Sequence, residues 1–114
     1  MRIRLTRESV AMGDDARAPH EEYLDMPDGT TFGQAVDRVI WQQYLARIKG
    51  GRATWLVTVG QTVHAVVAQE WATPSWLTDP DVPAPAEVHF RYLAQRDPGA
   101  VFAELSRLLP DADM

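Results

Sequence analysis

Residues 31–48, TFGQAVDRVIWQQYLARI, form the longest stretch with a helical pattern, and strand-like sequence lies on both sides of it. Thr31 and Gln34 have the spacing of a capping box, in which each side chain accepts a hydrogen bond from a free backbone N–H of the first turn. Lys49 and the pair Gly50-Gly51 come directly after this stretch, and both a cation and glycine are typical of helix C-termini. The sequence therefore predicts one helix over residues 31–48.

This predicted helix carries two apolar stripes. The first consists of Phe32, Ala35, Val36, Val39 and Ile40, and the second consists of Trp41, Tyr44, Leu45 and Ile48. At 100° per residue the stripes are rotated by more than 90° from each other, so the helix either breaks near Trp41 or is buried on two sides. No glycine or proline lies between Gln34 and Lys49, and we therefore favour one continuous helix with Trp41 in the core.

Short segments of alternating or apolar sequence predict five strands around the helix, at residues 2–7, 22–26, 53–59, 63–71 and 87–95. The third and fourth strands form a hairpin around Gly60-Gln61, with Trp55 in the core. Strict alternation on the second arm places Val63 with Ala65 and Val67 on one face, and His64 with Val66 on the other. Asp97 and Pro98 predict the start of a last helix over residues 97–109. Its apolar stripe consists of Val101, Phe102, Leu105, Leu108 and Leu109.

Residues 72–86, ATPSWLTDPDVPAPA, contain four prolines. Proline restrains the chain without donating a backbone hydrogen bond, so this segment is predicted to be an extended, semi-rigid loop and not a strand. Its Trp76 is either an anchor for a partner or a residue that fixes the loop to the domain. The predicted order of elements is thus ββαβββα, an α+β domain.

Length and composition exclude several classes of protein. A chain of 114 residues is expected to form one domain, and its lack of cysteine excludes disulfides, thiolate metal sites and a thiol nucleophile. No secretory signal and no apolar run of 18 residues is visible, so a cytoplasmic protein without membrane contact is expected. The net charge of −5 argues against nucleic-acid binding. An arginine-rich composition without asparagine indicates a GC-rich bacterial genome.

Side chains that carry catalysis are sparse. The histidines, His20, His64 and His89, lack the spacing of zinc ligands, and no serine lies in a Gly-x-Ser-x-Gly turn. No glycine-rich loop that binds phosphate precedes a helix. We therefore expect no catalytic residue, no metal site and no cofactor. One alternative stays open, a small-ligand or enzyme site under the 72–86 loop that uses His64, His89, Arg91 and Glu70.

The stretch LDMPDGTTFGQAVDRVI, residues 24–40, resembles the strand–turn–helix of the ubiquitin-like β-grasp superfamily. The hairpin WLVTVGQTVHAV, residues 55–66, is similar to the later hairpin of that family, and the resemblance covers residues 2–95. It implies a β-grasp-like mixed sheet that recognises other proteins with its open face. Modifiers and sulfur carriers of this superfamily end in Gly-Gly after the last strand. Here Asp97-Pro98-Gly99 and a helix follow, so conjugation and sulfur transfer are not expected.

The leading hypothesis is a small protein–protein interaction module, either monomeric or homodimeric. Its predicted partner-binding residues lie on the open sheet face and the proline-rich loop: Leu56, Val66, Leu93, His64, His89, Arg91 and Trp76. This requires the last helix to pack against the second stripe of the 31–48 helix and leave the face free. The alternative packing, on the sheet face itself, would hide it. Another hypothesis is an acidic immunity protein or antitoxin that masks a basic toxin.

Overall fold

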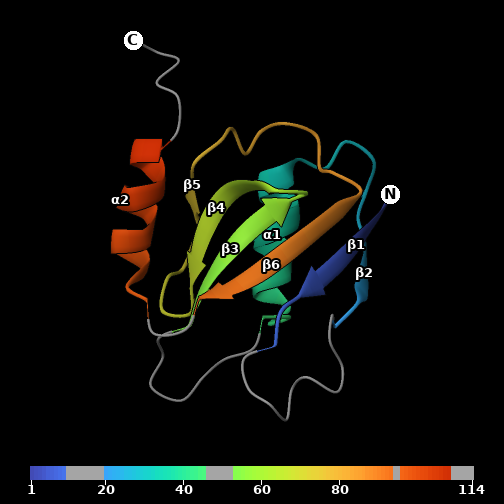
Figure 1. The fold of residues 1–114 in the computed structure, drawn as a ribbon. Helices are drawn as coiled ribbons and strands as arrows, with labels where there is room; N and C mark the ends of the chain where they lie inside the picture. The colour runs from blue at the N-terminus through green and yellow to red at the C-terminus, as the bar shows by residue number, and fades with distance from the viewer. Residues whose placement is uncertain (10–19, 46–52, 94–95, 109–114) are drawn as a thin grey trace.

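A computed structural model of the chain describes residues 1–9, 20–45, 53–93 and 96–108. These residues form an α+β domain in which a mixed sheet lies between two helices (Figure 1). The elements, in chain order, are β1 (Arg2–Arg7), β2 (Glu22–Asp25), α1 (Phe32–Trp41), β3 (Thr54–Val59), β4 (Thr62–Ala68), β5 (Ser75–Trp76), β6 (Glu87–Leu93) and α2 (Pro98–Leu108). The predicted α+β class is confirmed, but β5 lies inside the segment predicted to contain no strand.

The strands of this sheet follow the order β2-β1-β6-β3-β4-β5. β1 and β6 are parallel neighbours, and every other pair of neighbouring strands is antiparallel. The main core fills the space between the sheet and α1. Its largest fully buried side chains include Trp55, Phe90, Ile3, Val36 and Val39. The alternation predicted for β1, β3 and β6 supplies the sheet side of this core, and the first helical stripe supplies the other side.

Helix α1 is shorter than predicted. The capping box is confirmed, because Gln34 N–H donates to Thr31 Oγ1 and Thr31 N–H donates to Gln34 Oε1. The helix ends at Trp41, however, and Gln43 adopts a left-handed φ of 58°. This turn brings Tyr44 and Leu45 back against the main core. The prediction of a continuous helix over residues 31–48 is therefore wrong, and the break near Trp41 is what occurs. Ile48 lies outside the described residues.

The physical reason is that the turn after α1 packs Tyr44 and Leu45, half of the second stripe, against the main core. No second layer of structure on the outer side of the helix is then needed to bury them. A left-handed residue other than glycine costs about 1–2 kcal/mol. Packing of Tyr44 and Leu45 against the core offsets that cost, since full burial of one side chain of this size contributes about 1.5–3 kcal/mol and both residues are partly buried. Trp41 is left behind on the solvent side of the helix, so its predicted core position is wrong as well.

Helix α2 begins as predicted, since Asp97 Oδ2 accepts a hydrogen bond of 2.8 Å from Ala100 N–H. It packs on the face of the sheet opposite α1, which we call the α2 face (Figure 1). The favoured prediction, in which this helix packs against Trp41 and Tyr44, is wrong. The contact between α2 and the sheet forms a second apolar cluster, separate from the main core. It consists of Leu56, Val63, Val66, Trp71, Leu93, Val101, Phe102 and Leu105.

The proline-rich loop closes the N-terminus of α1. Val82 and Pro80 carbonyls accept hydrogen bonds of 2.8 Å from the N–H groups of Phe32 and Gly33, which have no partner inside the helix. A Cβ atom at Gly33 would lie 3.0 Å from the Cβ of Pro80, so glycine permits this close approach. The loop is therefore an integral wall of the domain.

Candidate functional site

The apolar part of the predicted partner-binding face is covered. Leu56 is 6% exposed and Val66 is fully buried, because Val101 and its neighbours on α2 lie over them. Leu93 is half-buried at the edge of the same cluster. The α2 face therefore offers a partner no open apolar surface at Leu56 and Val66 and little at Leu93, so the apolar part of the expected open face is covered.

The polar part of that face stays open beyond α2. His89 Nδ1 and Thr6 Oγ1 share a hydrogen bond of 2.7 Å, and the Glu8 carboxylate lies 3.9 Å from both His89 Nε2 and Arg91 Nε. Glu8 also accepts a hydrogen bond of 2.9 Å from the N–H of Tyr92. The side chains of His89, Arg91 and Glu8 are each about a third to a half exposed, so these contacts form an ordinary solvated network between β6 and the end of β1.

A β-bulge places His64 on the opposite face from His89. The register of β3 and β4 shifts between Val57 and Thr58, so Thr58 faces Val63 and the alternation along β4 changes there. The ring of His64 consequently lies 5.1 Å from that of Phe32, on the side of α1. The prediction that both histidines share one face is wrong. The alternative site of His64, His89, Arg91 and Glu70 is not assembled.

His64 and Trp76 hold the proline-rich loop against the core. His64 Nδ1 shares a hydrogen bond of 2.8 Å with Thr78 Oγ1, and its carbonyl accepts one of 2.8 Å from Leu77 N–H. Trp76 packs edge-on against Phe32 at 5.0 Å between ring centroids. Both side chains are half-buried in these contacts, so Trp76 fixes the loop to the domain.

Burial lowers the pKa of His64 below its ordinary value. Because the folded protein disfavours the charged ring, the contribution of His64 to stability is complete above the unfolded pKa and is lost as the pH falls through the folded one. The free energy of unfolding should therefore decline more steeply between about pH 8 and pH 5 in the native protein than in His64→Gln. Denaturant titrations across this range test it, and parallel curves for the two proteins would contradict it.

The most exposed aromatic side chain in the described residues is Trp41, which is 74% exposed at the end of α1. It borders an open hollow of about 760 Å³ between the β2–α1 connection and the outer face of α1, which Met26, Asp28, Gln34, Asp37 and Arg38 also line. The Arg38 guanidinium lies 5.3 Å from the Trp41 ring centroid. The sequence analysis missed this site, although the second apolar stripe, which begins at Trp41 and is rotated away from the first, was the signal.

A second hollow lies next to the turn that follows α1. It measures about 640 Å³ and lies between β2 and the turn that follows α1, with Glu22, Tyr23, Gln42 and Tyr44 in its wall. The hydroxyl of Tyr44 donates a hydrogen bond to the carbonyl of His20. Burial raises the pKa of Tyr44 to about 12, so this phenol keeps its proton and acts as a structural tie.

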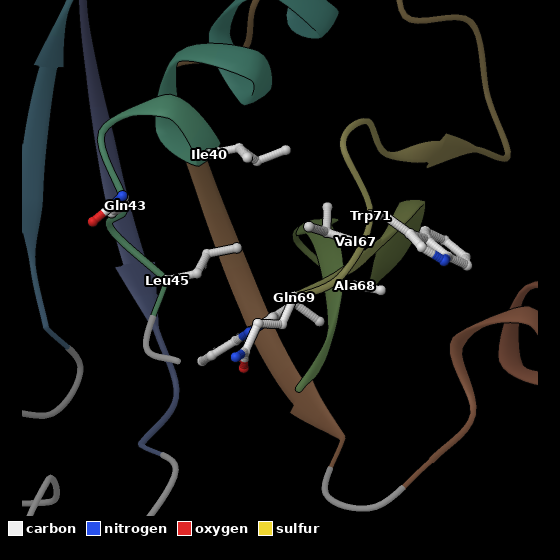
Figure 2. A pocket seen from close by; sticks show the side chains of 8 residues that line it. Ile40, Gln43, Leu45, Val67, Ala68, Gln69 and Trp71 are labelled. Carbon is white, nitrogen blue, oxygen red and sulfur yellow. The ribbon is translucent and has the colours of Figure 1, made fainter. Parts of the chain in front are cut away.

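A third pocket is too small for a ligand. It lies at the C-terminal end of α1, where Ile40 and Leu45 point toward Val67, while the ring of Trp71 points away from them (Figure 2). Its volume of about 60 Å³ accommodates about two water molecules. Small-molecule sites enclose about 300–1,000 Å³. We therefore treat this pocket as a packing gap of the core.

Comparisons with protein-family models, curated proteins and solved structures found no match to this chain. Within the described ranges, no three side chains of His, Asp or Glu gather where they would hold a metal ion. Neither α1 nor α2 is long and apolar enough to cross a membrane. The exposed surface around Trp41, between β2 and α1, is the candidate site.

Proposed function

We propose that the protein is a non-catalytic protein–protein interaction module with a β-grasp-like core and an added C-terminal helix. The order of the strands supports the β-grasp-like core. The antiparallel pair β1 and β2 precedes a helix that crosses one face, and β6 lies between β1 and β3, parallel to β1. Strand β5 and helix α2 are additions at the far side of this core.

The observation that carries the interaction proposal is the exposure of Trp41. Burying an indole of this size in a partner removes about 150–250 Å² of surface from water, which contributes roughly 4–6 kcal/mol before the costs of association. The side chain contributes little to the core, because within the described ranges of the chain the Arg38 guanidinium is the one group that stacks on it. Tryptophan and arginine are also the residues most often found at the centres of interfaces.

Replacement of Trp41 by alanine tests this proposal. Leu108→Ala is the matched control, because Leu108 is an apolar residue of nearly equal exposure, 76%, on the other helix. Chemical cross-linking in the native host followed by quantitative mass spectrometry should show partners that the native protein and Leu108→Ala share. Trp41→Ala should recover them at least about tenfold less, as expected for loss of a central aromatic contact. Equal recovery with all three proteins would remove Trp41 from the interface.

A further inference from the structure

Strand β2 has a free edge beside the Trp41 surface. It is the last strand on its side of the sheet, and β1 is its hydrogen-bonding neighbour. Met26 N–H donates to Met1 C=O and the Met1 amino group donates to Met26 C=O, so these two residues exchange hydrogen bonds. In an antiparallel ladder such pairs alternate, so the backbone groups of Tyr23 and Asp25 point away from β1.

These outward groups form a short template for another strand. In the described part of the chain, no hydrogen bond joins the backbone N–H or C=O of Tyr23 or Asp25 to another residue. Two donors and two acceptors therefore lie in a row along the edge. The Tyr23 ring, 49% exposed, lies on the α2-face side of that edge with the Arg2 guanidinium 4.9 Å from its centroid. Addition of a peptide strand to a free sheet edge of this kind is a common mode of peptide recognition.

The other side of the edge is lined by carboxylates. We call the two hollows between β2 and α1 together the β2–α1 groove; their walls contain Glu21, Glu22, Asp28 and Asp37, with Arg7 and Arg38. Glu21 already pairs with Arg4 at 2.5 Å and Asp28 with the Met1 amino group at 3.3 Å, so Glu22 and Asp37 are the carboxylates that have no ion pair in the described residues. These two carboxylates, in a chain with a net charge of −5, favour a cation. The Trp41 ring, which is 74% exposed and stacks with the Arg38 guanidinium on one face, attracts a cation on its other face.

We propose that the β2 edge binds an extended, basic segment of the partner as an additional antiparallel or parallel strand. This inference rests on the interaction module proposed above and assigns the chemistry of its partner. Backbone groups of the segment pair with Tyr23 and Asp25. Its alternate side chains, arginine or lysine, enter the β2–α1 groove toward Glu22, Asp37 and the Trp41 ring.

A second copy of this chain is a poorer occupant of the edge. Pairing of β2 with another β2 would bring two acidic segments together, each containing Glu21, Glu22 and Asp25. Like charges that face each other across strands are destabilising. Arg2 and Arg4 already pair with Asp25 and Glu21 of their own chain, at 3.4 Å and 2.5 Å. Glu22 has no ion pair in the described residues, so pairing of two copies would still bring two uncompensated carboxylates to the same edge.

Proline at position 23 tests the strand pairing. Tyr23→Pro removes an outward N–H and places a ring on the edge, but it removes no hydrogen bond to β1, and edge strands tolerate proline at such positions. Tyr23→Ala is the matched control, since it removes the phenol ring and keeps the N–H. Amide hydrogen exchange of β1 and β6 would verify that both variants are folded.

The probes are two octapeptides, one of alternating lysine and valine and one of alternating glutamate and valine. The lysine peptide should slow amide exchange at Tyr23 and Asp25 in the native protein, and at Asp25 in Tyr23→Ala. The glutamate peptide should leave exchange at these amides unchanged. Binding of the lysine peptide to Tyr23→Pro should be about tenfold weaker than to Tyr23→Ala.

Each other outcome overturns the inference. Equal binding by the proline and alanine variants, or unchanged exchange at Tyr23 and Asp25, removes the strand pairing. Equal binding of both peptides removes the basic partner. A dimer in sedimentation that Tyr23→Pro alone dissociates assigns the edge to a second copy. Dependence of partner recovery on Trp41 is measured separately, so the interaction module can stand while the strand pairing fails.

Discussion

Replacing Trp55 with alanine is expected to lower the free energy of unfolding by about 3–5 kcal/mol, whereas Trp41→Ala should change it by less than about 1 kcal/mol. Trp55 is 1% exposed and packs against the Tyr92 ring at 5.1 Å, so its loss removes apolar burial and leaves a cavity. At Trp41 most of the ring is already in water, and the contact with Arg38 contributes only about 0.5–1 kcal/mol.

Urea titrations of the two variants and the native protein measure this contrast. A domain of this size has a total stability of about 5–15 kcal/mol, so the Trp55 variant should lose a large part of it and shift its midpoint strongly. The Trp41 variant should keep both midpoint and slope. A loss at Trp41 comparable to that at Trp55 would mean that the indole is buried, and the surface proposed for partners would then be closed.

The two tryptophans also show which parts of this fold the sequence predicts. Trp55 lies in the apolar run Trp55-Leu56-Val57 between two other clear strand signals, so its burial follows from the pattern of one hairpin. The local caps at Thr31 and Asp97 were predictable for the same reason, because each depends on residues within one turn. Interactions between near neighbours in the chain are visible in the sequence.

Trp41 could not be placed in this way, because the end of α1 depends on a balance of distant contacts. A left-handed Gln43 is unfavourable locally and carries no glycine signal. It is stabilised by the packing of Tyr44 against Phe90, whose ring centroids lie 6.1 Å apart. The position of the helix end is therefore set by a residue more than forty positions away along the chain.

The candidate site was missed for a related reason. Strict alternation along β4 predicted a shared face for His64 and Val66, but one extra residue at the bulge exchanged the faces of Val63 and His64. The last helix had two apolar surfaces against which it could pack, the second stripe of the 31–48 helix and the sheet face, and its own stripe fits either. Only the burial of Leu56 and Val66 by α2 shows that the open surface lies elsewhere, between β2 and α1.

Substitution of Val101 by aspartate is expected to detach α2 from the sheet. Val101 is 3% exposed in the cluster with Leu56 and Val66, so the variant loses the burial of one aliphatic side chain and would place a carboxylate in an apolar contact. These terms together amount to about 3 kcal/mol or more. The cost cannot exceed the free energy that docks α2, because the helix can leave the sheet and carry the charge into water.

Amide hydrogen exchange measures this detachment for each element. Protection should fall in α2, and exposed Leu56 and Val66 should bind an apolar dye, while β1, β6 and α1 keep most of their protection. Ala103→Asp is the matched control, since it adds the same charge at an exposed position of the same helix and should cost less than about 0.5 kcal/mol. Equal effects of the two aspartates would show that α2 does not cover this face. The predicted partner surface at Leu56, Val66 and Leu93 would then return as the competitor of the β2–α1 groove.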